Sequence, residues 1–356
     1  MPFDHELIAA AWQNDVPEAA RLIAAGADVN ALDDTVQSAF LIAASEGYAD
    51  LLDLTLAHGA NIRSLDSYHG TALIRAAERG HATVVGTLIR AGVAVDHVNN
   101  LGWTALHEAV LLGKGTPPYV DTVRLLIAAG ADRDKPAERD GTTPLQAATS
   151  DVLAVLGTAR PEYPTTALLQ AATTGDANLA AAALAAGAAL ESRDGNRRTA
   201  LLLASLNDNV DVARLLVGLG ADPNAQDDRL DSAWLATGVT GSVAMLETLL
   251  PAGPDLNLRN RFGGISIIPA SERGHVDYVR RVIGTGINVD HVNNLGWTAL
   301  LEAVILGHGT TRWQQIVQLL LDAGATPDLA DADGVTPLQH ARDRGYTAIA
   351  ALLSQM

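Results

Sequence analysis

The chain has 356 residues and no cysteine, which excludes disulfides, zinc thiolate sites and thiol catalysis. Its formal net charge of −17 argues against nucleic-acid and anionic-membrane partners, because affinity for phosphates depends on clustered lysine and arginine, although acidity also serves solubility alone. No basic segment followed by an apolar one opens the chain, and no uncharged apolar stretch of 18 residues appears later. We therefore expect a soluble, cytoplasmic protein without a membrane partner.

Glycines recur at a fixed interval, each closing an apolar stretch with helical spacing. One series, 33 residues apart, is Gly26, Gly59 and Gly92, and a second with the same interval is Gly187, Gly220, Gly253 and Gly286. The last step of each series, to Gly130 and to Gly324, is 38 residues, so both carry a five-residue insertion in the same repeat. Such a period predicts a solenoid of stacked repeats, an architecture suited to binding.

A single repeat, residues 71–103, predicts two helices and a connection. Apolar residues at helical spacing over 72–77 indicate a first helix that Gly80 ends, and those over 84–89 indicate a second that Gly92 closes. The turn-rich remainder, to about residue 102, is expected to reverse direction before Thr104 caps the next first helix.

The first helices open with related phrases: TALHEAV at 104, TPLQAAT at 143, TALLQAATTGD at 166, TALLLAS at 199, TALLEAV at 298 and TPLQHARDRG at 336. With GADVNALDD at 26 and GADPNAQDD at 220, they resemble the ankyrin repeat over nearly the whole chain. The resemblance implies an all-α solenoid of stacked antiparallel helix pairs, with projecting hairpin loops and a concave binding face. We count about eleven helix-turn-helix repeats, beginning near Leu7, Ser38, Thr71, Thr104, Thr143, Thr166, Thr199, Ser232, Ile265, Thr298 and Thr336.

The fifth repeat is cut short by GTARPEYP, in which Pro161 and Pro164 are expected to break any helix. Repeats one to five map onto repeats seven to eleven with an offset of 194 residues. We therefore expect two tandem modules, 1–160 and 165–356, and the second resembles stand-alone six-repeat bacterial ankyrin proteins of unknown role. The sequence favours a continuous stack but leaves a bend at 161–164 open.

One segment is retained far better than the rest between the two modules. Residues 96–116 and 290–310 differ at only three of 21 positions, namely 107, 111 and 114. By contrast, residues 7–15 and 201–209 share three identities or fewer. The retention indicates a constraint beyond the scaffold, while gene conversion or a tight fit around the insertion would produce the same pattern.

In the ankyrin pattern, the concave face is lined by the hairpin tip and by the two residues before the glycine that ends the first helix. In the fourth and tenth repeats these are Asn100, Leu101, Trp103, Leu111 and Leu112, and Asn294, Leu295, Trp297, Ile305 and Leu306. The third and ninth repeats add Tyr68, Glu78 and Arg79, and Arg261, Phe262, Glu272 and Arg273. Tryptophan suits a binding hot spot, and equally suits packing on the next hairpin. Likewise, charges at a helix end are often only solvated.

We expect non-catalytic recognition of another protein, with Trp103 and Trp297 as anchors. The two patches would lie roughly 60 Å apart at about 10 Å per helix layer, a separation that suits bivalent binding. No catalytic residue, cofactor or metal site is expected, and an enzymatic role is not favoured but stays undecided.

Two alternatives stay open. A groove near Trp103, Glu108 and His97, repeated near Trp297, Glu302 and His291, would bind or convert a small molecule. The other alternative is a structural protein that associates with itself. His107 occupies the ankyrin position that links neighbouring loops, so we interpret it as structural; its counterpart is Leu301.

Overall fold

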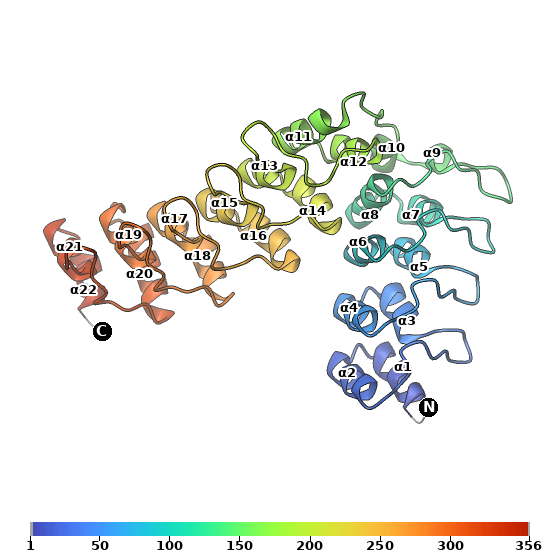
Figure 1. Cartoon of the computed structure of the whole chain (residues 1–356), viewed down its shortest axis with the longest axis horizontal. Coiled ribbons are helices and arrows are strands. Elements are labelled where there is room, and N and C mark those ends of the chain that lie inside the picture. Colours follow the sequence, from blue (N-terminus) through green and yellow to red (C-terminus); the bar gives the residue numbers. More distant parts are fainter. Residues whose placement is uncertain (1–2, 355–356) are drawn as a thin grey trace. The chain divides into compact units, whose positions relative to one another are not determined.

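The structure is a computed structural model, and it describes residues 3–354 (Figure 1). Within that range the chain forms 22 α-helices and one short 3-10 helix, with no strand beyond the isolated bridges Leu65–Thr71 and Arg193–Thr199. The predicted all-helical solenoid fold is confirmed. No described helix combines the length and the apolar character that crossing a membrane requires.

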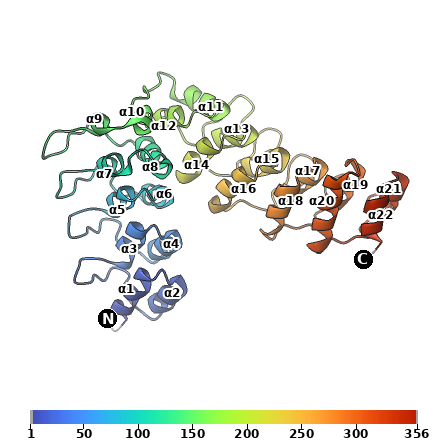
Figure 2. The ribbon, with the colours of Figure 1, turned by 180° about the vertical axis from the view of Figure 1, so that it is seen from behind.

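The helices follow one another as antiparallel pairs, one pair to a repeat (Figures 1 and 2). The first five pairs are α1 (Asp4–Trp12) and α2 (Val16–Ala24), α3 (Ala39–Glu46) and α4 (Ala49–Ala57), α5 (Ala72–Glu78) and α6 (Ala82–Arg90), α7 (Ala105–Gly113) and α8 (Pro117–Ala128), and α9 (Pro144–Ala147) and α10 (Ser150–Leu156). The other six are α11 (Pro164–Thr174) and α12 (Ala177–Ala185), α13 (Ala200–Leu206) and α14 (Val210–Gly218), α15 (Ala233–Thr240) and α16 (Val243–Leu249), α17 (Ile267–Glu272) and α18 (Val276–Ile283), α19 (Ala299–Ile305) and α20 (Thr311–Asp322), and α21 (Pro337–Asp343) and α22 (Thr347–Leu353). The 3-10 helix, Leu250–Ala252, follows α16.

Most first helices begin at the predicted Ser or Thr. The hydroxyl of each accepts a hydrogen bond from the backbone N–H three residues later, as N-caps do; these residues are Ser38, Thr71, Thr104, Thr143, Thr199, Ser232, Thr298 and Thr336. The ninth repeat differs, because Ile265 has no hydroxyl and α17 begins only at Ile267. As Pro161 and Pro164 predict, no helix runs through residues 157–163, between the end of α10 at Leu156 and the start of α11. Pro164 is the first residue of α11, where a missing N–H costs nothing.

The core is a strip between neighbouring pairs. First helices pack on first helices, α3 on α5 and α5 on α7, and second helices pack on second helices in the same order. Buried alanines such as Ala76 and Ala77 allow close approach, while Leu73 and Leu88 fill the remaining space. The exposed side of each first helix and its hairpin loop therefore lie outside the core, available for contacts with other molecules.

Two compact units are distinguished by their internal contacts. The N-terminal unit extends to Ala171 and includes Asp176–Leu190 and Gly218–Gly220. The C-terminal unit comprises Ala172–Gly175, Glu191–Val217 and the chain from Ala221 onward. The division of the sequence into modules 1–160 and 165–356, and their origin by duplication, stay predictions.

In the N-terminal unit, the hairpin loops leading into α3, α5, α7 and α9 project side by side, on the side of the first helices (Figure 1). We call the surface formed by the hairpin tips and the exposed sides of the first helices the loop-side face. This surface carries the candidate site residues of each unit.

Candidate functional site

The retained segment is organised by an asparagine in the hairpin. The Asn99 Oδ1 accepts hydrogen bonds from the backbone N–H groups of Leu101 at 2.9 Å and Trp103 at 3.1 Å. In the tenth repeat, the Asn293 Oδ1 accepts the same bonds from Leu295 and Trp297 at 2.9 and 3.0 Å. A side chain that bonds its own backbone in this way fixes the turn. The hairpin tips in both units therefore hold one defined conformation.

The other end of this amide binds a buried glutamate. The Asn99 Nδ2 donates to the Oε1 of Glu108 at 3.0 Å, and the Asn293 Nδ2 donates to the Oε1 of Glu302 at 2.8 Å. Glu108 is only 4% exposed and Glu302 only 6%. Each asparagine thus ties the hairpin to the first helix of its own repeat, nine residues later. The bond gives Glu108 and Glu302, whose role the sequence left open, a structural partner.

Two other repeats place a matched pair at the same two positions. In the third repeat, the Asp66 Oδ2 lies 3.4 Å from the Nε of Arg75, and in the eleventh, the Asp331 Oδ2 lies 2.7 Å from the Nε2 of His340. In these two repeats aspartate is paired with a basic residue, whereas in the fourth and tenth repeats asparagine is paired with glutamate; two carboxylates at these positions would repel each other. This pairing explains why the retained segment keeps its first asparagine together with its glutamate.

Burial changes the acidity of both glutamates. Removal from water, together with the neighbouring Glu78, raises the pKa of Glu108 to about 7, although the bond from Asn99 opposes the rise. Burial likewise raises the pKa of Glu302 to about 7, with Glu272 adding to the rise and Asn293 opposing it. Both carboxyl groups are therefore partly protonated near neutral pH.

The hairpin tips expose large side chains beside ordered backbone. The N–H of Asn100 donates to the carbonyl of Tyr68, and that of Asn294 donates to the carbonyl of Phe262, both at 2.9 Å. Tyr68 is 58% exposed and Phe262 is 51% exposed. The side chains of Asn100 and Asn294 are exposed as well.

Both tip tryptophans, Trp103 and Trp297, are half-buried. The asparagine turn needs only their backbone N–H groups, so it does not explain why both repeats retain tryptophan. The two roles considered for these side chains, binding and packing, both stay hypotheses.

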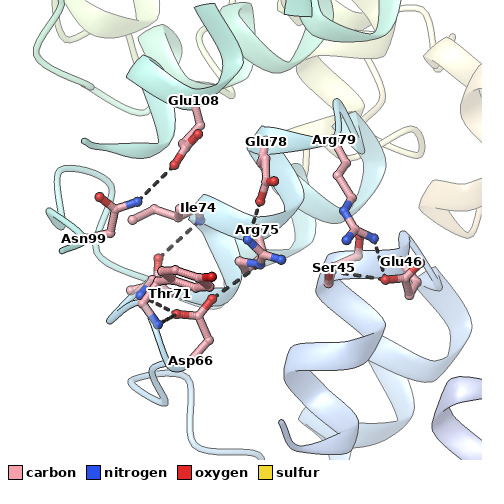
Figure 3. A network of polar contacts seen from close by, with 12 residues as sticks. Ser45, Glu46, Asp66, Thr71, Ile74, Arg75, Glu78, Arg79, Asn99 and Glu108 are labelled. Carbon is pink, nitrogen blue, oxygen red and sulfur yellow. Dashed lines mark hydrogen bonds and ion pairs between the residues drawn. The ribbon is translucent and has the colours of Figure 1, made fainter. Parts of the chain in front are cut away.

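The charged residues of the third repeat form a network rather than a simple pair (Figure 3). Arg75 contacts Glu78 at 2.5 Å, and Arg79 contacts Glu46 of the preceding repeat at 2.5 Å. Arg79 therefore links two repeats and is not merely solvated. Tyr119 also joins this region, because its hydroxyl donates to the carbonyl of Glu78 at 2.9 Å.

The ninth repeat arranges its charges differently. Arg261 lies 3.2 Å from Asp231, and its guanidinium stands 4.4 Å from the centre of the Phe262 ring. This distance fits a cation–π contact. Glu272 is half-buried at the end of α17, and Arg273 beside it is exposed. The arginine that contacts the Phe262 ring is thus Arg261, from the hairpin.

Leucines at the ends of the first helices complete the loop-side face. Leu111 and Leu112 are 38% and 44% exposed, and Leu306 is 41% exposed, whereas Ile305 is half-buried. The tip residue Leu295 is 53% exposed, while its counterpart Leu101 is half-buried. Exposed apolar groups are thus present at four of these positions, namely Leu111, Leu112, Leu295 and Leu306.

The histidines near this face form links between loops. The Nε2 of His97 lies 2.8 Å from the carbonyl oxygen of His69, and that of His291 lies 2.7 Å from the carbonyl of Gly263. His107 contacts the hydroxyl of Thr104 at 2.9 Å and the carbonyl of Thr142 at 3.3 Å. The structural interpretation of His107 is confirmed.

Sequence reasoning missed three contributors to this region: Arg75, Asn99 and Asn293. The sequence did contain a signal for each of them, because each is one member of a pair of polar residues spaced nine apart: Asp66 and Arg75, Asn99 and Glu108, and Asn293 and Glu302. Only the structure shows that the hairpin folds back onto its own helix, so that these two positions meet.

Comparison with known proteins agrees with the fold. A family model described as ankyrin repeats (3 copies) matches residues 7–97, 77–157, 152–227 and 234–331. The putative ankyrin repeat protein YahD of Escherichia coli (strain K12) is 51% identical over 94 residues, which cover 26% of this chain and 47% of YahD. The chain therefore matches about half the length of this relative.

Two crystal structures are similar as well. An ankyrin repeat domain from Acinetobacter baumannii AYE is 50% identical with a TM-score of 0.52, and the match covers 55% of this chain and 98% of that domain. Another solved ankyrin repeat protein is 36% identical with the same TM-score of 0.52, covering 54% of this chain and 98% of that protein. Ankyrin repeats generally mediate protein–protein interaction. The chain belongs to the ankyrin-repeat family.

Proposed function

We propose that this protein is a non-catalytic scaffold that binds another protein through its loop-side face. One binding patch lies in each unit. The N-terminal patch consists of Tyr68, Asn100, Leu101, Trp103, Leu111 and Leu112. The C-terminal patch consists of Phe262, Asn294, Leu295, Trp297, Ile305 and Leu306.

The observation that carries the proposal is the exposure of large apolar side chains on a rigid surface. Tyr68 and Phe262 are each more than half exposed, on tips whose backbone is held by hydrogen bonds. Aromatic and aliphatic groups on a preorganised surface favour binding, because little conformational entropy is lost on association. The asparagine–glutamate pair accounts for Asn99 and Glu108, but it does not require the neighbouring Asn100, Leu101 or Trp103. Retention of these three in the second copy supports a role in binding.

Two similar patches in one chain also suit a partner with two copies of the recognised segment. Binding at the first patch raises the effective concentration of the second segment, so the total affinity exceeds that of either patch. The bivalent arrangement is part of the proposal.

The test is capture of partners from the host cytosol on the immobilised protein, with identification by mass spectrometry. A variant of both patches, Y68A/L112A/F262A/L306A, is compared with the wild type. These side chains are exposed, so their truncation leaves the core intact. The control, L32A/Y163A, removes exposed apolar groups outside both patches. We expect a protein that the wild type and the control retain and the patch variant loses; equal recovery by all three would contradict the proposal.

A further inference from the structure

The C-terminal unit exposes arginines where the first helices of its last repeats end. Arg273 follows α17 and Arg344 follows α21, each as the C-cap, and Leu306 holds the same position after α19. All three side chains are exposed. Because α17 packs on α19 and α19 packs on α21, these residues form a row across three neighbouring repeats (Figure 1).

A further arginine reaches this row from a second helix. Arg312 is the second residue of α20, and its guanidinium stands 5.9 Å from the centre of the Trp313 ring. A side chain at Gly274 would collide with the methylene groups of Arg312, so this arginine lies over the residue that follows Arg273. Burial lowers the pKa of His275, and Arg273 and Arg312 both add to the lowering. The two arginines thus lie beside the same turn. The arginine row, as we call it, consists of Arg273, Leu306, Arg312 and Arg344.

The helices themselves do not account for all of these charges. A cation at the end of a helix interacts favourably with the helix dipole, which gives Arg273 and Arg344 a local role. The same dipole disfavours a cation at the beginning of a helix, where Arg312 is located. At an offset of 194 residues, the N-terminal unit has Pro118 at this position. The fold therefore does not require Arg312.

The arginines of the row are not neutralised by the chain. Within residues 3–354, no ion pair joins Arg273, Arg312 or Arg344 to an acidic residue, and all three are exposed. By contrast, Arg280 and Arg281 on α18 are both held in ion pairs. The guanidinium groups of the row are therefore available to a ligand.

Two carboxyl groups occur next to the row. Glu272 precedes Arg273 and is half-buried, and Asp343 precedes Arg344 and accepts a hydrogen bond from Gln339 at 2.6 Å. The exposed Arg342 adds another cation. Four arginines thus outnumber two carboxyl groups, so this surface is locally positive in a chain whose net charge is −17.

The N-terminal unit pairs the corresponding arginine from within. Arg79 contacts Glu46 at 2.5 Å, as Figure 3 shows. At the offset of 194 residues, Arg79 corresponds to Arg273, whereas Glu46 corresponds to Thr240. The C-terminal unit therefore keeps the arginine but lacks its carboxylate. A carboxylate from another molecule can take that place.

The spacing of the row determines what kind of ligand fits. At about 10 Å per helix layer, Arg273 and Arg344 are roughly 20 Å apart, with Leu306 between them. An extended chain covers this distance in about six residues, at about 3.3 Å per residue. A matching segment has two acidic residues about six positions apart and an apolar residue between them.

We propose that the arginine row binds an extended acidic segment of a partner protein. One carboxylate lies against Arg273 and Arg312, a second lies against Arg344, and an apolar side chain between them contacts Leu306. Arginine and carboxylate form strong charge-assisted hydrogen bonds, often as two parallel bonds. A nucleic acid is disfavoured, because the net charge of −17 repels a long polyanion more than a short segment with two charges. This inference rests on the proposed function and specifies the chemistry of the partner at the C-terminal patch.

The test uses a random dodecapeptide library displayed on phage, selected on the full-length protein. Four variants are compared with the wild type: R273Q/R312Q/R344Q, T240E, L306A and the control R63Q/R139Q/R160Q. The control removes three exposed arginines outside the row, so its net charge equals that of the first variant. T240E introduces the carboxylate that the N-terminal unit has at Glu46, so it occupies Arg273 from within the chain. Far-UV circular dichroism establishes that each variant is folded.

We expect the wild type and the control to enrich peptides with two acidic residues about six positions apart and an apolar residue between them. A synthetic peptide from this selection should bind R273Q/R312Q/R344Q at least about tenfold more weakly than the wild type. T240E and L306A should weaken its binding as well. Raising NaCl from about 50 mM to about 500 mM should weaken binding to the wild type, because salt screens exposed charges.

Other results would overturn the inference in distinct ways. Enriched peptides that require Leu306 but show no acidic preference would refute the arginine row as a carboxylate site and leave the proposed function intact. Acidic peptides that bind R273Q/R312Q/R344Q as tightly as the wild type, or that lose affinity equally for the control, would refute the assignment to these arginines. Equally tight binding of a fluorescent oligonucleotide would show that any polyanion is held. No enrichment above background would also refute the inference, while the cytosol capture would still decide the proposed function.

Discussion

The buried glutamate of the fourth repeat makes a quantitative prediction for the variant E108Q. Glutamine preserves the oxygen that accepts the bond from Asn99 but cannot ionise. Glu108 has its pKa raised from 4.5 to about 7 in the folded chain and is only 4% exposed. A raised pKa means that the folded state binds the proton more tightly than the unfolded state. The stabilisation is complete below pH 4.5 and is lost as the pH rises through 7.

The magnitude follows from the size of this shift. At about 1.4 kcal/mol per pKa unit, the full effect is on the order of 3 kcal/mol, of which about 2.5 kcal/mol falls between pH 5 and pH 8. The free energy of unfolding of E108Q minus that of the wild type should therefore increase by about 2.5 kcal/mol across this range. The sign is fixed, because only the wild type must bury a charge at high pH.

The assay is urea unfolding followed by far-UV circular dichroism at several pH values. Only the difference between the two proteins is interpreted, because other groups titrate in the same range. Burial lowers the pKa values of His81, His107 and His275, so the folded protein loses the stability that they contribute as the pH falls. This pH dependence is opposite to that of Glu108. The control E162Q, at an exposed position, should show a constant difference. A constant difference for E108Q as well would show that folding does not raise the pKa of Glu108.

Three further predictions concern contacts between and within repeats. In a double-mutant cycle by urea unfolding, N99D and E108R should each destabilise the protein, while the double variant recovers at least about 1 kcal/mol by forming an aspartate–arginine pair; strict additivity would contradict the pairing rule. G238A should cost roughly 1–3 kcal/mol or more, because the added carbon would lie 1.9 Å from the carbonyl oxygen of Ser266, and a thermal midpoint equal to that of the wild type would be inconsistent with this packing. Y119F should lose about 1 kcal/mol in urea unfolding with its bond to the preceding repeat, and an unchanged midpoint would show that this bond contributes nothing.

Much of the fold was predictable because its signals are local. The hydroxyl caps at Thr71 and Thr104 and the glycines that follow the helices specify where each helix begins and ends, whatever lies elsewhere in the chain. The start of α11 was harder to predict, for a related reason. A proline breaks the interior of a helix but is well accommodated at its first position, and the sequence alone did not show where α11 begins.

The candidate site was predictable only in part. Exposure of Tyr68 and Phe262 follows from the ankyrin pattern, since hairpin tips project from the core. The partner of Glu108 did not follow, because a contact across nine residues depends on how the hairpin folds back and on which side-chain atom faces the helix. The ion pair between Arg79 and Glu46 could not be predicted for the same reason, because it joins residues of different repeats.

Both patches are proposed to bind one partner through their exposed apolar groups. The most direct test is isothermal titration of the captured partner with the wild type, with the variants Y68A/L112A and F262A/L306A, and with their combination. We predict that each patch variant weakens binding by about tenfold or more and that the combination abolishes it. If all four proteins bind the partner with equal affinity, the loop-side face is not the binding surface.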